Sequence, residues 1–332
     1  RYGCLRTETS PQSRFSISGH DSKITFSQMK CHQTPFLGIE TPFSDYKSAA
    51  VAILPLPYEG GISYGEGTAM APQAVLEASH YLEFYDEELK QEPYKAGIAT
   101  IAPPAMLEQL HDMVDALIED GKWVVVVGGD HSISSGAFQA MKKRSGAASV
   151  IQLDAHADLL ESYEGNPYSH ASVMARMREH TPHTLHIGIR SISAEEAELA
   201  EEKSIPILTM TEYRQGKWNL EAELKKLPDP VFLTIDVDVF DWSVIFSTGT
   251  PEPGGFQWHE AMRILHTIFL KKNVIGCDVV ELSYRESDPN SPFAVAKLIY
   301  KCIGYKMLDE IQQKAIKWPQ KPNGRFFTFN HE

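Results

Sequence analysis

Cysteine is scarce in this chain of 332 residues, which contains only four. They are scattered along the sequence without a Cys-x-x-Cys pair, at Cys4, Cys31, Cys277 and Cys302. Disulfide frameworks and structural zinc sites both need closely spaced cysteines, so neither is expected here. We therefore predict reduced thiols in a cytoplasmic protein.

Long apolar segments are also absent. A helix that crosses a bilayer needs about 20 predominantly apolar residues. The longest compact apolar runs in this chain, such as Trp123–Val127, have only the length of a strand. Residues 1–36 are rich in Ser, Thr and Gln and lack the apolar stretch of a signal peptide. The sequence thus predicts no association with a membrane.

Basic residues are outnumbered by acidic ones, since 31 Lys and Arg face 44 Asp and Glu. The formal net charge is −13. A nucleic-acid surface needs clustered Lys and Arg, so we predict no nucleic-acid partner. An acidic protein attracts small cationic molecules, although solubility alone accounts for the charge equally well.

Short β-branched runs and amphipathic segments alternate from about residue 49 onward. Strands are predicted at Ala50–Leu54, Trp123–Val127, Ser149–Leu153, Thr184–Ile189, Pro206–Thr209, Val231–Ile235 and Val274–Val280. Helices are predicted at Pro72–Glu83, Met106–Asp120, Ser134–Lys143, Leu220–Leu227, His259–Leu270 and Phe293–Gln312. Repeated βα units imply an α/β fold, a three-layer α/β/α sandwich with a mainly parallel sheet. We expect one domain at 37–332, preceded by a poorly ordered N-terminal arm at 1–36.

Residues that bind metal ions follow the ends of the predicted strands Trp123–Val127, Ser149–Leu153 and Val231–Ile235. The candidate ligands are His131, Asp154, His156, Asp158, Asp236 and Asp238. In parallel α/β sheets, ligands bind just beyond the carboxyl ends of the strands. In extended backbone, residues at i, i+2 and i+4 point the same way. The three residues at 154, 156 and 158 can therefore converge, as can the pair at 236 and 238.

Four carboxylates gathered in one place repel one another unless positive charge compensates them. Each of these residues alone is more simply interpreted as a helix cap or a hydrogen-bonded core residue. All six together at strand ends favour a metal centre. Carboxylate oxygens with some imidazole suit Mn²⁺, and Ni²⁺ or other divalent ions are compatible. We predict two divalent metal ions per chain that activate a water molecule for hydrolysis.

The same segments resemble the ureohydrolase family, which comprises arginases, agmatinases and their relatives. The motifs are Gly-Gly-Asp-His-Ser at 128–132, Asp-Ala-His-Ala-Asp at 154–158 and Thr-Ile-Asp-Val-Asp-Val-Phe-Asp at 234–241. The resemblance implies a binuclear manganese centre and a trimer or hexamer of identical chains. Asp154 and Asp236 would bridge the two ions. One ion would also bind His131 and Asp158, and the other His156 and Asp238.

The resemblance also implies roles for Glu281, His170 and Asp130. Glu281, at the end of Val274–Val280, would pair with a guanidinium, a planar cation that suits a carboxylate. His170 would pass a proton to the departing amine, because imidazole titrates near neutral pH. Asp130 would orient His131. A surface glutamate and an ordinary loop histidine are the plainer interpretations of the first two.

Several loops resemble those of agmatinases rather than arginases. They are Leu-Pro-Tyr-Glu at 56–59, Ser-Tyr-Gly at 63–65, Ser-Tyr-Glu-Gly-Asn at 162–166 and Thr-Pro-Glu-Pro-Gly-Gly at 250–255. The arginase loop that binds the α-amino and α-carboxylate groups of an amino acid is not recognisable at 161–170. The implied reaction is the hydrolysis of agmatine, a small cationic guanidino compound, to putrescine and urea. In one departure, Trp242 follows Asp241 where the family usually has proline, and Trp242 or Phe246 could line the pocket.

Three other functions compete with this interpretation. The substrate could be 4-guanidinobutyrate, another guanidino acid, or guanidine itself with nickel. Zinc-dependent deacetylation on a related fold is disfavoured, because a single-metal site would leave Asp158 and one further aspartate unused. A non-catalytic regulatory subunit is disfavoured, because all the predicted ligands are present.

Overall fold

The computed structural model describes residues 29–308, so residues 1–28 of the arm predicted at 1–36 lie outside the described residues. Within that range, one sheet of eight strands has the order β2-β1-β3-β8-β7-β4-β5-β6. Every neighbouring pair in it is parallel. The strands are β1 Val51–Leu56, β2 Ile98–Thr100, β3 Trp123–Gly128, β4 Ser149–Leu153, β5 Thr184–Ile189, β6 Ile207–Thr209, β7 Val231–Asp236 and β8 Val274–Val280. The predicted fold class is confirmed.

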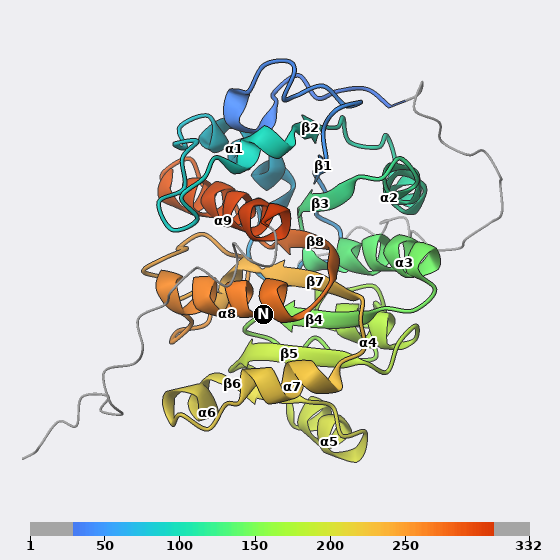
Figure 1. The fold of residues 1–332 in the computed structure, drawn as a ribbon. Coiled ribbons are helices and arrows are strands. Elements are labelled where there is room, and N and C mark those ends of the chain that lie inside the picture. The colour runs from blue at the N-terminus through green and yellow to red at the C-terminus, as the bar shows by residue number, and fades with distance from the viewer. Residues whose placement is uncertain (1–28, 309–332) are drawn as a thin grey trace, which may run out of the picture.

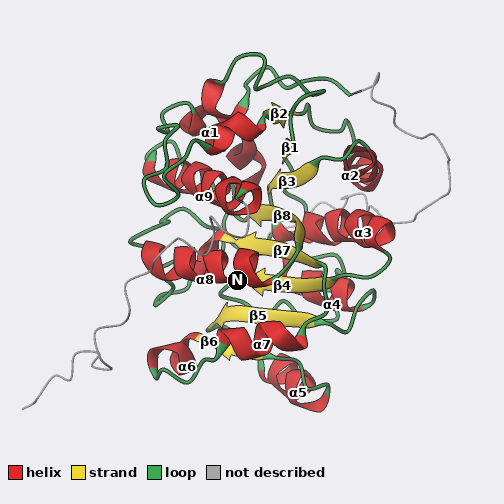
Figure 2. Ribbon diagram, viewed as in Figure 1, coloured by secondary structure: helices red, strands yellow, loops and turns green. Residues whose placement is uncertain are grey.

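Helices cover both faces of the sheet (Figure 1). They are α1 Ala71–Ser79, α2 Leu110–Glu119, α3 Ser134–Ser145, α4 Val173–Arg178, α5 Ala194–Glu202, α6 Met210–Arg214, α7 Leu220–Lys226, α8 Trp258–Lys271 and α9 Asn290–Met307. On one face α9 packs against α1 and α8, and on the other α3 packs against α2 and α4. Figure 2 shows the strands as a layer between these helices.

Alternate residues of the central strands enter two separate hydrophobic cores. Val125 and Val127 of β3 belong to the core under α1, α8 and α9, whereas Val124 and Val126 belong to the core under α2, α3 and α4. All of them are buried, as expected for a strand covered on both faces. The continuous apolar run that predicted this strand therefore fills both cores.

Most predicted strands and helices are found within a few residues of their expected bounds. The strands at 149–153, 184–189 and 274–280 have the predicted bounds. The short elements β2, α4, α5 and α6 were not predicted. Such short segments have too few turns to show a periodicity, although α5 and α6 each begin with a capping box. The last residues of the helix predicted at Phe293–Gln312 lie outside the described residues.

The final part of the predicted N-terminal arm packs on the domain. Cys31 forms a bridge with Ile101. Phe36 is fully buried, and its backbone N–H donates to the Thr100 hydroxyl at 2.8 Å. The segment 29–36 is thus part of the folded domain, because its apolar side chains add to the core beside β2.

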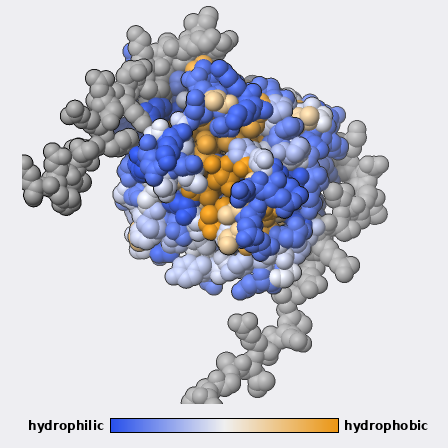
Figure 3. Space-filling view, turned by 90° about the horizontal axis from the view of Figure 1, so that it is seen from below, coloured by the Kyte–Doolittle hydropathy of each residue, from blue (hydrophilic) through white to orange (hydrophobic). Residues whose placement is uncertain are grey.

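The edge strand β6 lies at the end of the sheet away from β2. Its three residues are only half buried. Figure 3 views the molecule from this end and shows an apolar area surrounded by polar residues. In the part of the chain that the structure describes, no helix has the length and hydropathy to cross a membrane.

A buried ion pair joins α9 to the loop that follows α1. The Lys301 ammonium lies 2.7 Å from Asp86 Oδ1 and 2.8 Å from Glu88 Oε2. The side chains of Lys301 and Asp86 are 3% and 0% exposed. Lys297 lies on the same helix, 3.6 Å from Asp86 Oδ2, and is 23% exposed. Lys301 is therefore the main compensation for a fully buried carboxylate.

We expect the substitution Lys301→Met to lower the free energy of unfolding by about 3 to 5 kcal/mol, because it leaves Asp86 buried without its main cation. The matched substitution Lys297→Met should cost under about 1 kcal/mol, because that pair is longer and more exposed. Urea unfolding of the two variants checks this. Equal losses in both variants would contradict it.

Candidate metal centre

Four neighbouring strands of the sheet bring the predicted site residues to one edge. In the order β3-β8-β7-β4, the carboxyl end of β3 leads to His131, that of β8 to Glu281, and β7 ends at Asp236. The segment 154–158 follows β4. The parallel direction of the strands, which Figure 2 shows by their arrowheads, places all these ends on the same side.

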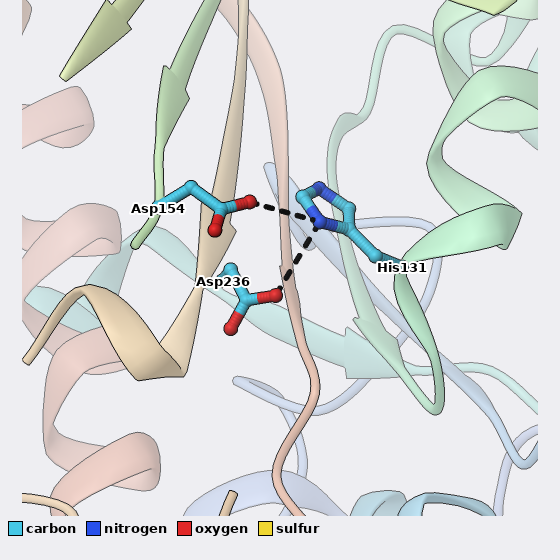
Figure 4. A group of neighbouring side chains, drawn as sticks. All are labelled: His131, Asp154 and Asp236. Carbon is cyan, nitrogen blue, oxygen red and sulfur yellow. Dashed lines mark ion pairs between the residues drawn. The ribbon is translucent and has the colours of Figure 1, made fainter. Parts of the chain in front are cut away.

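One group of ligand atoms surrounds the His131 ring. Its Nδ1 lies 3.2 Å from Asp154 Oδ2, 3.2 Å from Asp158 Oδ2 and 3.4 Å from Asp236 Oδ2. Figure 4 shows the carboxylates of Asp154 and Asp236 pointing at this nitrogen. All four residues are buried. Three of them, at 131, 154 and 236, satisfy the geometry of a metal site.

A second group lies on the other side of Asp154. His156 Nδ1 is 2.9 Å from Asp238 Oδ2 and 3.6 Å from Asp154 Oδ1. These three residues also satisfy the geometry of a metal site. Asp154 therefore offers one carboxylate oxygen to each group, and the structure brings all six predicted ligands together. His156 has the most exposed side chain of this second group, at 24%.

The donor set fits a cation, as the His131 ring shows. Its Nε2 lies 2.8 Å from the Thr234 hydroxyl, which donates to Asp278 Oδ1 at 2.6 Å. The ring must then donate from Nε2, and in the neutral ring that binds a metal, Nδ1 is an acceptor that faces carboxylate oxygens. This buried Nδ1 has no hydrogen-bond partner among the described residues. Acceptors that face one another repel, and a metal ion bound between them removes the repulsion.

The pKa values of the carboxyl groups indicate the same need for positive charge. Burial and the charge of Asp154 raise the pKa of Asp158 to about 7. Burial and the neighbouring carboxylates at 238 and 154 raise the pKa of Asp236 well above its usual value. Burial and mutual repulsion therefore oppose the ionisation of these carboxyl groups, and bound cations would relieve both.

The ligands converge through turns rather than through a regular strand. The predicted alternation assumed extended backbone, but β4 ends at Leu153, and Asp158 has a φ of 54° in the left-handed region. Asp238 lies in a short 3₁₀ turn, and its N–H donates to Asp236 Oδ1 at 2.8 Å. Likewise the His156 N–H donates to Asp154 Oδ1 at 2.6 Å. The ligands themselves shape the loops that carry them.

Asp130 has a different role from the expected one. Its Oδ2 accepts hydrogen bonds from the backbone of Gly60 and Gly61, both at 2.7 Å. Its Oδ1 accepts from the Ser132 N–H at 3.0 Å. Thr234, and not Asp130, holds the His131 ring. Asp130 instead fixes the loop after β1 against the site, because its carboxylate satisfies backbone donors that the loop leaves free.

Two polar networks behind the ligands were not predicted. The first is the pair Thr234 and Asp278, which holds the His131 ring. In the second, the Gln152 amide donates to Asp154 Oδ2 at 2.7 Å, and Gln152 Oε1 lies 2.5 Å from His186 Nδ1. All four side chains are fully buried. The signal available in the sequence was a polar residue inside an otherwise apolar strand, because such a residue needs a buried hydrogen-bond partner. The networks orient the ligands that face the ions.

His170 and Glu281 lie together beside the ligands. His170 Nδ1 is 3.1 Å from Glu281 Oε1, and its Nε2 is 2.8 Å from the Ser63 hydroxyl. Burial lowers the pKa of His170, but its hydrogen bond to Glu281 and the negative charges of Glu281, Asp158 and Asp130 together outweigh burial and raise the pKa to about 9. Glu281 Oε1 also accepts from the His131 N–H at 2.7 Å. Its Oε2 is buried without a partner among the described residues.

A cavity of about 290 Å³ opens onto the two metal groups. His156, Asp158, Asp236 and His170 line it, together with the apolar side chains Leu160, Tyr163 and Ile192. Trp242 and Phe246, which could have lined the pocket, are exposed and do not belong to its lining.

Comparisons with known proteins agree with this geometry. Residues 49–304 match the arginase family. An N(1)-aminopropylagmatine ureohydrolase of Synechocystis is 42% identical over 277 residues, covering 79% of this chain and 90% of that protein. An agmatinase of Pyrococcus horikoshii is 31% identical, covering 80% and 95%. The crystal structure of agmatine ureohydrolase of Thermoplasma volcanium has a TM-score of 0.71 and 26% identity, covering 83% and 94%.

We expect the substitution Thr234→Val to weaken metal binding by about 10- to 100-fold, because it removes the hydroxyl that orients His131. Titration of the chelated protein with Mn²⁺ measures the affinity. Thr181→Val is a suitable control, since Thr181 is also buried and its hydroxyl accepts from the nearby His183 backbone N–H, away from the ligands. An unchanged affinity in the Thr234 variant would rule out the orienting role.

Proposed function

The chain belongs to the arginase family and is a metal-dependent ureohydrolase, and we propose that it hydrolyses agmatine to putrescine and urea. The observation that carries the choice of substrate is the charge of the cavity. Among the described residues, no Lys or Arg lines it, whereas Asp158, Asp236 and Glu196 do. A guanidino acid would bring its tail carboxylate towards Glu196, with no Lys or Arg in the described lining to pair with it. A guanidine with an amino group at its other end brings only positive charge.

Glu281 is suited to hold the guanidinium. One of its oxygens is fixed by the His131 N–H and the His170 ring, and the other has no partner among the described residues. The backbone at Glu281 has a φ of 67°, a strained conformation that is typical of functional sites. A rigidly held carboxylate with a free oxygen can accept the N–H groups of a planar cation.

His170 is suited to deliver a proton to the departing amine. Water adds to the guanidino carbon, the bond from this carbon to the alkyl nitrogen breaks, and that nitrogen takes a proton as urea forms. Glu281 favours the protonated ring, and Ser63 holds its other nitrogen. A protonated imidazole beside the reacting group can act as a general acid.

The six ligands at 131, 154, 156, 158, 236 and 238 would hold two divalent cations, and we propose Mn²⁺ for both. When bound, such a pair lowers the pKa of a shared water molecule and supplies hydroxide near neutral pH. The chain's own contribution is the strained loops and buried networks that fix the ligands before the ions bind.

N(1)-Aminopropylagmatine is a second candidate substrate. The relative that is 42% identical to this chain carries the name of an N(1)-aminopropylagmatine ureohydrolase. The additional aminopropyl arm is attached to the amino nitrogen far from the guanidine. Tyr163 and Ile192 both line the cavity and are exposed, so they mark its opening to solvent. An arm that extends past them would leave the reacting end of the substrate unchanged.

An assembly of identical chains and a cytoplasmic location stay predictions of the sequence. The trimer or hexamer is consistent with the apolar area at the end of the sheet that carries β6 (Figure 3), because apolar areas on a surface often mark protein contacts. Sedimentation analysis of the purified protein would show the number of chains.

With Mn²⁺ present, we expect urea release from agmatine and N(1)-aminopropylagmatine. The kcat/KM for 4-guanidinobutyrate should be lower by about 100-fold or more, because like charges in the cavity cost several kcal/mol. Urea formation over a panel of guanidino compounds, including guanidine with Ni²⁺, measures this. His156→Ala is the inactive control. A preference for 4-guanidinobutyrate or guanidine would contradict the proposed substrate.

A further inference from the structure

Glu196 is a buried carboxylate that lines the substrate cavity and that the proposed mechanism does not use. It lies in the first turn of α5 and is 6% exposed. Within residues 29–308, no Lys, Arg or His forms an ion pair with it. A carboxylate is rarely buried unless a positive group compensates it. The cavity that it lines also lacks Lys and Arg among the described residues.

Two walls of the cavity hold this carboxylate in place. Oε1 accepts from the Leu159 N–H at 2.9 Å, and Oε2 accepts from the Ser193 N–H at 2.9 Å and from the Ser193 hydroxyl at 2.8 Å. The bonds to Ser193 belong to the capping box of α5. The bond to Leu159 does not, and it reaches the loop next to the metal ligand Asp158. Capping alone therefore does not account for the position of the side chain.

Apolar side chains flank the two points at which the carboxylate is held. Leu160 follows Leu159, and Ile192 precedes Ser193, and both line the cavity. An apolar surface beside a fixed negative charge matches a methylene chain that ends in an ammonium group. Glu281, near the metal ligands, supplies the other negative charge, for the guanidinium.

We propose that Glu196 receives the second cationic group of the substrate, an alkylammonium nitrogen joined to the guanidinium by a short methylene chain. The inference rests on the proposed function and deepens it. It assigns to this chain a preference for dications, in which Glu281 binds one end and Glu196 the other. A guanidine with an uncharged tail binds at one end only.

A purely structural role for Glu196 predicts a different result. Through Leu159 it could only support the loop that carries Asp158, and its loss would then reduce metal content and the hydrolysis of every substrate alike. If Glu196 instead recognises charge, its loss reduces only the hydrolysis of substrates with a cationic tail. The two roles therefore separate when two substrates that differ in that charge alone are compared.

The test uses the Mn²⁺-loaded enzyme with agmatine and with pentylguanidine, in which a methyl group replaces the ammonium. Glu196→Gln removes the charge and keeps the size, and its amide oxygen can still accept within the capping box, while the lost bond from the Leu159 N–H affects both substrates alike. We expect its kcat/KM for agmatine to fall by about 10- to 100-fold, mainly through KM, because a charged hydrogen bond is lost. Its kcat/KM for pentylguanidine and its metal content should change little.

Glu195→Gln is the matched control, because Glu195 lies in the same first turn of α5 but is exposed. It should leave both substrates unaffected. An equal loss for both substrates in the Glu196 variant, or no loss for agmatine, would overturn the inference. If that variant does not fold, the wild-type enzyme alone provides the test. Equal kcat/KM values of the wild type for agmatine and pentylguanidine would also overturn the inference. If the wild type releases no urea from either compound, the proposed function itself fails.

Discussion

The repulsion among buried carboxylates is the constraint on which the rest of the site depends. Asp154, Asp158, Asp236 and Asp238 lie together at the end of the sheet, and burial alone opposes their ionisation. Two imidazoles cannot neutralise four negative charges and also serve as metal ligands. Bound cations satisfy both the charges of the carboxylates and the acceptor nitrogen of a neutral His131 ring. The side chains are already gathered without the ions, so the fold must tolerate the repulsion until the ions bind.

The fold meets this constraint by fixing each ligand from behind. Thr234 holds the ring of His131, and Gln152 holds a carboxylate oxygen of Asp154. These contacts come from the interior of β7 and β4, where regular backbone pairing positions the side chains firmly. The ligands lie beyond the strands, in loops whose backbone is strained at Asp158. Rigid strands thus carry the supporting side chains, and short turns carry the ligands.

The sequence predicted the parts of the molecule in which a pattern repeats or a motif is local. Apolar runs located most of the sheet, and the spacing of the aspartates and histidines located the ligands. It did not show that Asp158 adopts a left-handed conformation, nor that Asp130 fixes the loop at 60–61, because both depend on contacts between distant segments. The partners Thr234 and Asp278 are 44 residues apart. Periodicity contains no information about such pairs.

The carboxylates of Glu281 and Glu196 limit which substrates the cavity can favour. A guanidine with one positive charge compensates Glu281 but leaves Glu196 unpaired, and a guanidino acid adds negative charge. In N(1)-aminopropylagmatine the secondary amine occupies the same position, relative to the guanidine, as the primary amine of agmatine. A contact with Glu196 would therefore serve both compounds equally. Discrimination between them must come from the opening of the cavity, near Tyr163, where the aminopropyl arm would meet the protein.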